Sequence, residues 1–266
     1  MYRLVALDVD GTLLDSSHRL SPGVRDAIHS AQRRGTTVCL ATGKLLVSVA
    51  HLLDELHLNG LQITCNGAAL MSVESGRPAE SWPLTYAHAE LAASTIRGLA
   101  PSMAIAWYTA DAIYADAPYG PLDDVLASYQ EPPLRHVFRL SDNLPAPLKL
   151  LVTGDQQRLL TLRDQLTERI GATLTVSRTT ADFVEVMAPA VSKGAALHAL
   201  AQRLGIVNEE IAAIGDGEND ISLLQAAGMG IAMGNAMPAL LSHATYTTRS
   251  NDEDGVAHAF AYLDLA

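Results

Sequence analysis

The sequence has few cysteines, few basic residues and no long apolar run. Only Cys39 and Cys65 occur among 266 residues, and both follow residues typical of buried strands. Two such thiols indicate buried side chains in a reducing compartment rather than a disulfide framework. We therefore expect a cytoplasmic protein.

Basic residues are outnumbered, since 18 Lys and Arg stand against 29 Asp and Glu, a formal net charge of −11. This balance argues against a general binder of nucleic acid or of anionic membranes. No apolar run approaches the roughly 18 residues that a membrane-spanning helix needs. Asp8 and Asp10 also interrupt the N-terminal segment where a signal peptide would be apolar. Nucleic acid and membrane are thus not the expected partners.

The composition nevertheless supports a sizeable core, because 48% of the residues are hydrophobic and 18% are charged. Nine of the 12 prolines fall between Pro78 and Pro147, so the middle of the chain differs from its two ends. We interpret 83–189 as an inserted α+β domain, and 1–82 together with 190–266 as one core domain.

The two ends of the chain alternate short apolar runs with helical stretches. This alternation predicts βαβ units and an α/β fold, a doubly wound, Rossmann-like parallel sheet. Expected strands of the core are 3–9, 37–42, 61–65, 211–215, 230–233 and 244–247; expected helices of the core start near Ser21 and Ser192 and cover 44–57, 220–227 and 236–243; the insert is expected to hold helices at 87–99 and 156–170 and strands at 103–108, 112–115, 148–153, 173–177 and 182–187.

Polar residues collect where the expected core strands end, which is where ligands bind in open parallel sheets. The first strand ends in Asp8-Val9-Asp10-Gly11-Thr12, the second in Thr42-Gly43, and a late one in Gly215–Asp220. Burying so many carboxylates without a partner is unfavourable, and a divalent cation would offset it. Hard oxygen ligands favour Mg²⁺ over Zn²⁺.

These stretches resemble the four motifs of the haloacid dehalogenase (HAD) superfamily of phosphohydrolases. They are Asp8-Val-Asp-Gly-Thr-Leu, Ala41-Thr-Gly, Ser192-Lys-Gly and Gly215-Asp-Gly-Glu-Asn-Asp. The position of the insert resembles the type II (IIB) cap. Cys65-Asn-Gly-Ala and Met233-Gly-Asn-Ala are similar to its Cof-like branch.

The resemblance implies a phosphatase that works through an aspartyl-phosphate. Asp8 would be the nucleophile, and Asp10 the acid and base. Mg²⁺ would be held by the Asp8 carboxylate, the Asp10 carbonyl and Asp216. Thr42 and the Gly43 amide would bind the phosphate.

Further site residues follow from the same resemblance. Lys193 would point a fixed positive charge at the phosphate, and Asn66 is a further candidate for phosphate binding. Asn219 and Asp220 are expected to brace the metal and the phosphate. Whether Asp220 binds the metal directly stays open.

One residue departs from the branch pattern, because Lys44 stands where Arg usually follows Thr-Gly. Lys is a point charge where Arg is a bidentate fork, so the substrate preference can differ. Lys44 is read either as a substrate contact or as a solvated helix residue. In the insert, Lys149 is the main candidate for facing the substrate, with Tyr114, His136 and Arg178 behind it.

The expected partner is therefore a small phosphorylated metabolite. Sugar phosphates come first, and phosphorylated cofactors such as pyridoxal phosphate or FMN come next. The alternatives are a sugar phosphomutase on the same core and, in another class, a phospho-accepting receiver-like signalling module. A 2-haloacid dehalogenase is disfavoured, because that branch lacks the second Asp. No feature predicts the oligomeric state.

Overall fold

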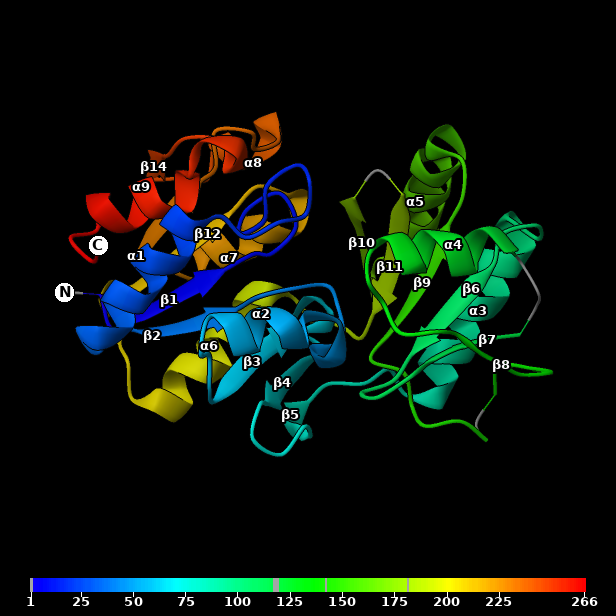
Figure 1. The fold of residues 1–266 in the computed structure, drawn as a ribbon. Helices are drawn as coiled ribbons and strands as arrows, with labels where there is room; N and C mark the ends of the chain where they lie inside the picture. The colour runs from blue at the N-terminus through cyan, green and yellow to red at the C-terminus, as the bar shows by residue number, and fades with distance from the viewer. Residues whose placement is uncertain (1, 117–119, 142, 181) are drawn as a thin grey trace. The chain divides into compact units, whose positions relative to one another are not determined.

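A computed structural model describes residues 2–116, 120–141, 143–180 and 182–266 (Figure 1). The chain divides into two compact units, Met1–Ala79 with Ser192–Ala266, and Glu80–Val191. The sequence placed the insert at 83–189, which starts three residues later and ends two residues earlier than the second unit. In the described part of the chain, no helix combines the length and the apolar character that crossing a bilayer requires.

The first unit is built on a five-stranded parallel sheet of order β14-β13-β12-β1-β2. Every residue of β1 and β12 is buried, as expected for parallel strands covered on both faces. The α/β class with a parallel core sheet is thus confirmed. The strands are β1 (Leu4–Leu7), β2 (Thr37–Leu40), β12 (Ile211–Gly215), β13 (Met229–Ala232) and β14 (Tyr246–Thr247).

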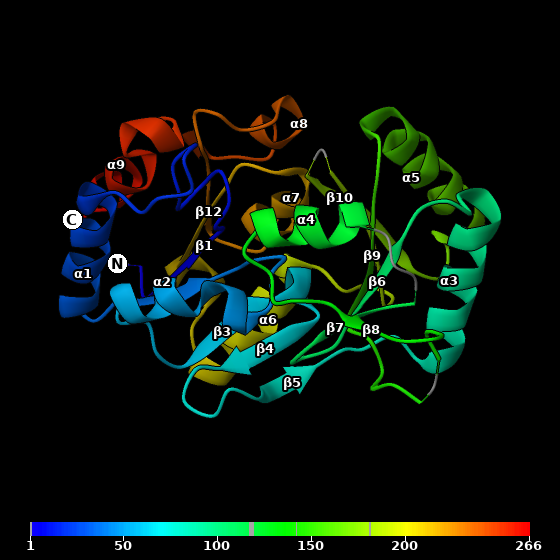
Figure 2. The same cartoon turned by 45° about the vertical axis from the view of Figure 1, so that its right-hand side comes forward.

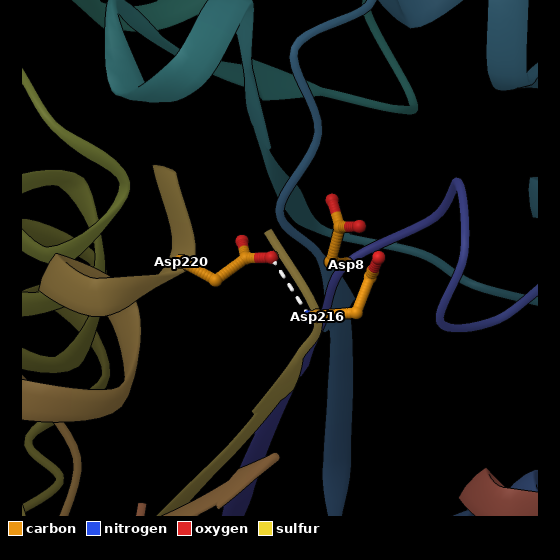
Figure 3. A group of neighbouring side chains, drawn as sticks. All are labelled: Asp8, Asp216 and Asp220. Atoms are coloured by element: carbon orange, nitrogen blue, oxygen red, sulfur yellow. Dashed lines mark hydrogen bonds between the residues drawn. The ribbon is translucent and has the colours of Figure 1, made fainter. Parts of the chain in front are cut away.

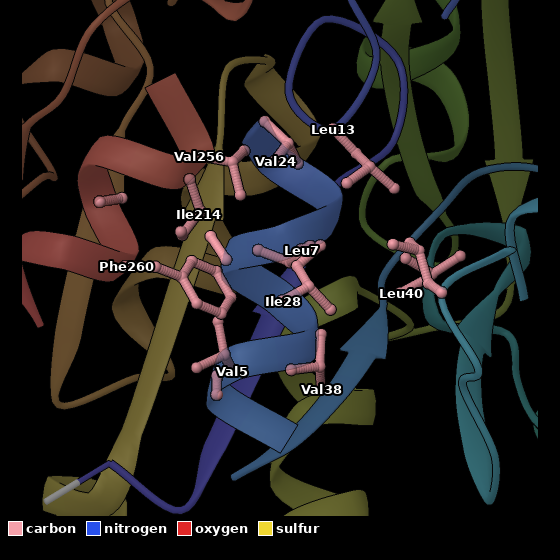
Figure 4. Close-up of a cluster of buried hydrophobic side chains, with 14 of the residues drawn as sticks. Val5, Leu7, Leu13, Val24, Ile28, Val38, Leu40, Ile214, Val256 and Phe260 are labelled. Carbon is pink, nitrogen blue, oxygen red and sulfur yellow. The ribbon is translucent and has the colours of Figure 1, made fainter. Parts of the chain in front are cut away.

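Helices cover both faces of this sheet, with α1 and α9 on one side and α6 and α7 on the other (Figure 2). Apolar residues of α1 and α9, including Ile28 and Phe260, meet Val5 and Leu7 of β1 in the hydrophobic core (Figure 4). The helices of this unit are α1 (Pro22–Arg33), α2 (Ala50–Glu55), α6 (Lys193–Leu204), α7 (Ile221–Gln225), α8 (Pro238–Leu241) and α9 (Gly255–Tyr262), with short 3-10 turns η1 (Leu46–Val49), η2 (Cys65–Gly67), η3 (Asn208–Glu210), η4 (Glu218–Asp220) and η5 (Asn251–Glu253).

The expected third core strand, β3 (Leu61–Thr64), does not extend the parallel sheet. It begins a separate three-stranded sheet of order β3-β4-β5, with β4 (Ala69–Ser72) antiparallel to it and β5 (Pro78–Ser81) at the edge. Next to β2 it forms only a single parallel bridge, Ala41 to Ile63. At Leu40 the N–H donates at 2.8 Å to the Gln62 Oε1 rather than to a main-chain carbonyl, while the Thr42 N–H donates at 2.9 Å to the Ile63 carbonyl.

The second unit is an α+β module around a six-stranded sheet of order β10-β11-β9-β6-β7-β8. Its neighbouring strands are antiparallel, except for the parallel pair β7–β8. Helix α4 and strand β8 were not predicted. The elements are α3 (Tyr86–Leu99), β6 (Ile105–Tyr108), β7 (Ile113–Ala115), α4 (Gly120–Ser128), β8 (Arg135–His136), β9 (Lys149–Thr153), α5 (Gln156–Ile170), β10 (Thr175–Thr180) and β11 (Phe183–Met187).

Both cysteines are buried thiols, as expected. Cys39 lies inside β2, where burial raises the pKa of its thiol to about 12. Cys65 is fully buried at the start of η2. Neither side chain is placed to act as an exposed reactive thiol.

Candidate active site

The candidate site lies at the carboxyl ends of β1, β2 and β12. Leu7 at the end of β1 is in register with Leu40 of β2 and with Ile214 of β12. The residues that follow these strands are therefore brought to one edge of the sheet. They include Asp8, Thr42 and Asp216, which the sequence places far apart.

Three carboxylates, Asp8, Asp216 and Asp220, each offer an oxygen within 4.8 Å of the others (Figure 3). Burial, and then the Asp220 charge, raise the pKa of Asp8 well above its ordinary value. The same two causes raise the pKa of Asp216 to about 6. Three carboxylates this close repel one another, and their hard oxygen donors suit a divalent cation. Such an ion would offset both the burial and the repulsion of these groups.

Lys193 supplies the positive charge inside this cluster. It is the first residue of α6, directly after Ser192, whose Oγ accepts the Ala195 N–H at 3.1 Å and caps the helix. The Lys193 Nζ lies 2.6 Å from Asp8 Oδ1 and 2.6 Å from Asp220 Oδ1. Burial lowers the pKa of Lys193, but the two carboxylates outweigh it and raise that pKa, so the ammonium stays charged.

Asp220 holds two parts of the site together. Its Oδ1 accepts from Lys193, while its Oδ2 accepts the backbone N–H groups of Asp216 at 3.1 Å and Gly217 at 2.9 Å. These contacts orient the Asp216 loop and the Lys193 ammonium toward the same place. Asp220 thus positions Lys193 and the Asp216 loop, whether or not it binds a cation itself.

Asp216 is fixed by the loop that follows β1. Its Oδ1 accepts from the Thr12 hydroxyl at 2.7 Å. A Cβ at Gly11 would lie 2.4 Å from Asp216 Oδ2, and Gly11 has a φ of +82°. Both the space and the left-handed backbone therefore require glycine at this position.

Asp10 lies beside two basic side chains. Lys44 Nζ lies 2.8 Å from Asp10 Oδ1, and His18 Nδ1 lies 3.8 Å from the same oxygen. Lys44 is only 6% exposed, which rules out the solvated alternative for this residue. No sequence pattern pointed to His18, because its proximity to Asp10 depends on the loop conformation.

Thr42, Gly43, Asn66 and Asn219 lie together at the ends of β2 and β3. Asn66 donates its N–H to the Thr42 carbonyl at 3.0 Å, and Asn219 Nδ2 donates to Asn66 Oδ1 at 2.9 Å. A Cβ at Gly43 would lie 3.1 Å from Asn66 Nδ2, so the two residues pack closely. The structure thus brings the predicted phosphate-binding residues of the core to one place.

The backbone at Asn66 is unusual. Cys65, Asn66 and Gly67 have φ values of 48°, 54° and 93°, all in the left-handed region. Such conformations are unfavourable for residues with a Cβ and persist only where the surroundings enforce them. A Cβ at Gly67 would lie 2.1 Å from the Ser192 carbonyl, so this tight turn also brings η2 against the start of α6.

The candidates in the second unit are mostly paired within that unit. Lys149 Nζ forms a buried ion pair with Glu185 Oε1 at 2.5 Å and lies 4.3 Å from the Tyr108 ring centroid. His136 Nε2 lies 3.5 Å from Asp123 Oδ2. The predicted substrate contacts of these residues, and those of Tyr114 on β7 and Arg178 on β10, stay predictions.

Comparison with known proteins agrees with these motifs. The family profile described as haloacid dehalogenase-like hydrolase matches residues 5–260. YxeH of Bacillus subtilis (strain 168) is 32% identical over 274 residues, covering 100% of each chain. The HMP-PP phosphatase of Cronobacter sakazakii is 32% identical over 252 residues, covering 91% of this chain and 88% of the relative.

The fold has solved counterparts with both units. The subclass IIB sugar phosphatase BT4131 superposes with a TM-score of 0.85 at 22% identity, covering 99% of this chain and 100% of that one. At this identity the likeness shows a shared fold. A family match over residues 5–260 also exceeds what a receiver-like signalling module would occupy. The chain therefore belongs to the haloacid dehalogenase-like hydrolases and is an enzyme of the HAD phosphatase type.

Proposed function

We propose that this chain is a Mg²⁺-dependent phosphatase that hydrolyses small phosphorylated metabolites through an aspartyl-phosphate on Asp8. The main support is the position of Asp8 at the end of β1, in contact with Lys193 and within 4.8 Å of Asp216 and Asp220. The nucleophile therefore lies beside a fixed positive charge and within a cluster that can bind a cation.

In the first step, an Asp8 oxygen attacks phosphorus while the bond from phosphorus to the leaving oxygen breaks. Lys193 Nζ donates to Asp8 Oδ1 at 2.6 Å and so orients the attacking carboxylate. Asp10 gives a proton to the leaving alcohol. In the second step, Asp10 takes a proton from water, which attacks the same phosphorus and restores the Asp8 carboxylate with release of inorganic phosphate.

The remaining core residues bind the phosphoryl group. The Thr42 hydroxyl and the Gly43 amide donate to its oxygens, and the Lys193 ammonium offsets its charge. Asn66 and Asn219, which hydrogen-bond each other, brace this pocket. Lys44 lies against Asp10 and is proposed to contact the substrate beside it.

The acidic cluster would hold Mg²⁺ through Asp8, the Asp10 carbonyl and Asp216, supported by Asp220. When bound, the ion neutralises negative charge that otherwise repels an anionic phosphate from an anionic nucleophile. The donor set supports this ion, since it consists of oxygen ligands only.

The substrate class is proposed from the family resemblance and from the relatives. Sugar phosphates are the first expectation and phosphorylated cofactors the second; one relative is an HMP-PP phosphatase. The unit Glu80–Val191 would act as the cap that selects among them, with Lys149 as its main candidate contact.

Phosphate release from a panel of phosphorylated metabolites, with and without Mg²⁺, tests the proposal. We expect release from sugar phosphates that is lost with EDTA and in Asp8→Asn. Asp26→Asn is the matched control, because Asp26 is exposed on α1 and pairs only at the surface with Arg25. Equal release from Asp8→Asn would contradict the mechanism. Phosphate transfer to a second sugar hydroxyl with little free phosphate would instead indicate a phosphomutase.

A further inference from the structure

Three residues near the C-terminus hold the loop that follows Asp10, and the proposed mechanism uses none of them. Asn235 belongs to the Met233-Gly-Asn-Ala stretch, and Asn251 and Asp252 begin the stretch Asn251-Asp-Glu-Asp. All three contact the loop Gly11–Ser16, more than 220 residues away in sequence.

The contacts are directed at backbone groups of the loop. Asn235 Nδ2 donates to the Gly11 carbonyl at 2.8 Å, and Asn251 Nδ2 donates to the Leu14 carbonyl at 2.9 Å. Asp252 Oδ1 accepts the Ser16 N–H at 2.8 Å. Asn235 Oδ1 accepts the Asn251 N–H at 2.9 Å, which joins the first two members. Together they form one connected set.

The loop has little freedom once these groups are held. Val9 accepts the Leu14 N–H at 3.0 Å, and Asp10 forms a bridge with Leu14, so the loop folds back on Asp10. Gly11, the next residue after Asp10, turns the chain with its φ of +82°. Fixing the Gly11 and Leu14 carbonyls therefore fixes the backbone from which the Asp10 side chain projects.

We propose that Asn235, Asn251 and Asp252 form a clasp that positions Asp10 for proton transfer, an inference that rests on the proposed function. They are positioning residues, because they contact the loop and not the reacting atoms. Lys44 holds the Asp10 carboxylate directly, while the clasp sets the backbone beneath it. Proton transfer requires hydrogen-bond distance, so a small displacement of Asp10 slows protonation of the leaving group.

Two substitutions of the clasp, Asn235→Asp and Asp252→Asn, keep the size of the side chain. Asn235→Asp keeps the acceptor for the Asn251 N–H but turns a carboxylate oxygen toward the Gly11 carbonyl, which repels it. Asp252→Ala removes the acceptor for the Ser16 N–H, whereas Asp252→Asn retains one and is the conservative rescue. Asn59→Ala is the matched control, since Asn59 Nδ2 donates to the His57 carbonyl outside the loop.

The test compares kcat/KM on two substrates, an alkyl phosphate with a poor leaving group and p-nitrophenyl phosphate, whose leaving group needs no proton. This ratio reports the steps up to formation of the aspartyl-phosphate, so the base role of Asp10 in the second step does not enter it. General acid catalysis contributes about 10²–10⁴-fold, so a misplaced Asp10 should cost at least about 10-fold on the alkyl ester. We expect that loss in Asn235→Asp and Asp252→Ala, and at most about a threefold loss on p-nitrophenyl phosphate. Asp252→Asn and Asn59→Ala should keep the wild-type ratio, and Asp10→Asn sets the limit of the effect.

Amide hydrogen exchange gives a second measurement that does not depend on turnover. The Ser16 amide should exchange faster in Asp252→Ala than in Asp252→Asn. Equal losses on both esters, or no loss on either, would overturn the clasp while leaving the phosphatase intact. A wild-type protein that releases phosphate from neither ester would overturn the proposed function, and the clasp with it.

Discussion

Asp216 carries the clearest conflict between stability and function at the scale of single residues. Its folded-state pKa is raised to about 6 by burial and by the Asp220 charge, from an ordinary value of 3.8. A carboxyl with a raised folded pKa stabilises the fold below pH 3.8 and loses that contribution as the pH rises through 6. The metal-free protein is therefore weakened by this group at neutral pH.

We predict that Asp216→Asn abolishes phosphate release but stabilises the metal-free protein at pH 7.5. About two pKa units correspond to roughly 3 kcal/mol in the free energy of unfolding, an upper value because neighbouring groups relax. The Thr12 hydrogen bond is retained, since an amide oxygen can accept it. Urea unfolding in EDTA at pH 7.5 and pH 4 checks this. The advantage of the variant should shrink at pH 4, and an equal advantage at both values would contradict it.

Lys193 and Lys149 are two buried lysines, one in each unit, and they allow a matched comparison. Lys193 contacts Asp8 and Asp220, and Lys149 contacts Glu185. Removing one partner of a buried ion pair leaves an uncompensated charge, which lowers the free energy of unfolding by about 3–5 kcal/mol. We predict that Lys193→Met and Lys149→Met both destabilise the protein by about this amount, as measured by urea unfolding.

The two variants should differ in their kinetics. Lys193→Met should lose phosphate release altogether, because the charge beside the nucleophile is gone. Lys149→Met should keep turnover, and a raised KM would support its predicted contact with the substrate. An unchanged KM would instead limit Lys149 to the ion pair with Glu185. Phosphate release from Lys193→Met near the wild-type rate would contradict its proposed role.

At the scale of elements, the strand β3 shows where a sequence prediction stops. The apolar run at 61–65 predicts a strand, and the structure has one at Leu61–Thr64. Beside β2, the Gln62 side chain accepts the Leu40 N–H, and it donates to the Asn59 carbonyl at 3.1 Å. The apolar pattern of a strand does not show that a side-chain oxygen will accept a bond in place of a main-chain carbonyl.

We predict that Gln62→Leu destabilises the first unit by about 1–3 kcal/mol, because it leaves the buried Leu40 N–H without an acceptor. Gln62→Glu retains an acceptor oxygen at the same length and is the matched variant for that bond. Leu40 amide exchange should accelerate in Gln62→Leu. Unchanged exchange and an unchanged unfolding midpoint in Gln62→Leu would show that the bond contributes nothing.

Helix α9 was missed from the sequence for a related reason. It spans eight residues, Gly255–Tyr262, and starts after Asp254, which has a left-handed φ of 55°. A helix this short, with no side-chain cap at its start, gives a weak sequence signal. Its buried Val256, Ala259 and Phe260 become intelligible only against α1 and β1 (Figure 4). Long-range packing therefore decides this element.

The site itself was more predictable than these elements. Asp8, Thr42, Lys193 and Asp216 follow strands or open a helix in order, and the register of β1, β2 and β12 brings the strand ends together. His18 and the residues that hold the Asp10 loop could not be predicted, because their contacts depend on loop geometry. Strand ends are fixed by topology, whereas side-chain contacts from loops are fixed by the finished fold.

At the scale of the whole molecule, the acidic cluster belongs to one unit only. Asp8, Asp216 and Asp220 all lie in Met1–Ala79 with Ser192–Ala266, and none lies in Glu80–Val191. Part of the net charge of −11 is therefore concentrated in these three carboxylates, and a bound cation would offset that part. A ligand that binds the folded state stabilises what it contacts, by about 2.7 kcal/mol at 100 times its Kd.

We predict that Mg²⁺ protects the first unit against hydrogen exchange and leaves the second nearly unchanged. Peptides covering β1 and the loop after it, and β12 with η4, should slow in Mg²⁺, because these segments carry the proposed cation ligands. Peptides from β9 and β11 should not, since Lys149 and Glu185 neutralise each other there. Asp216→Asn should remove the response, and Asp26→Asn should preserve it. Equal slowing of both units would mean that the cation acts on more than this cluster.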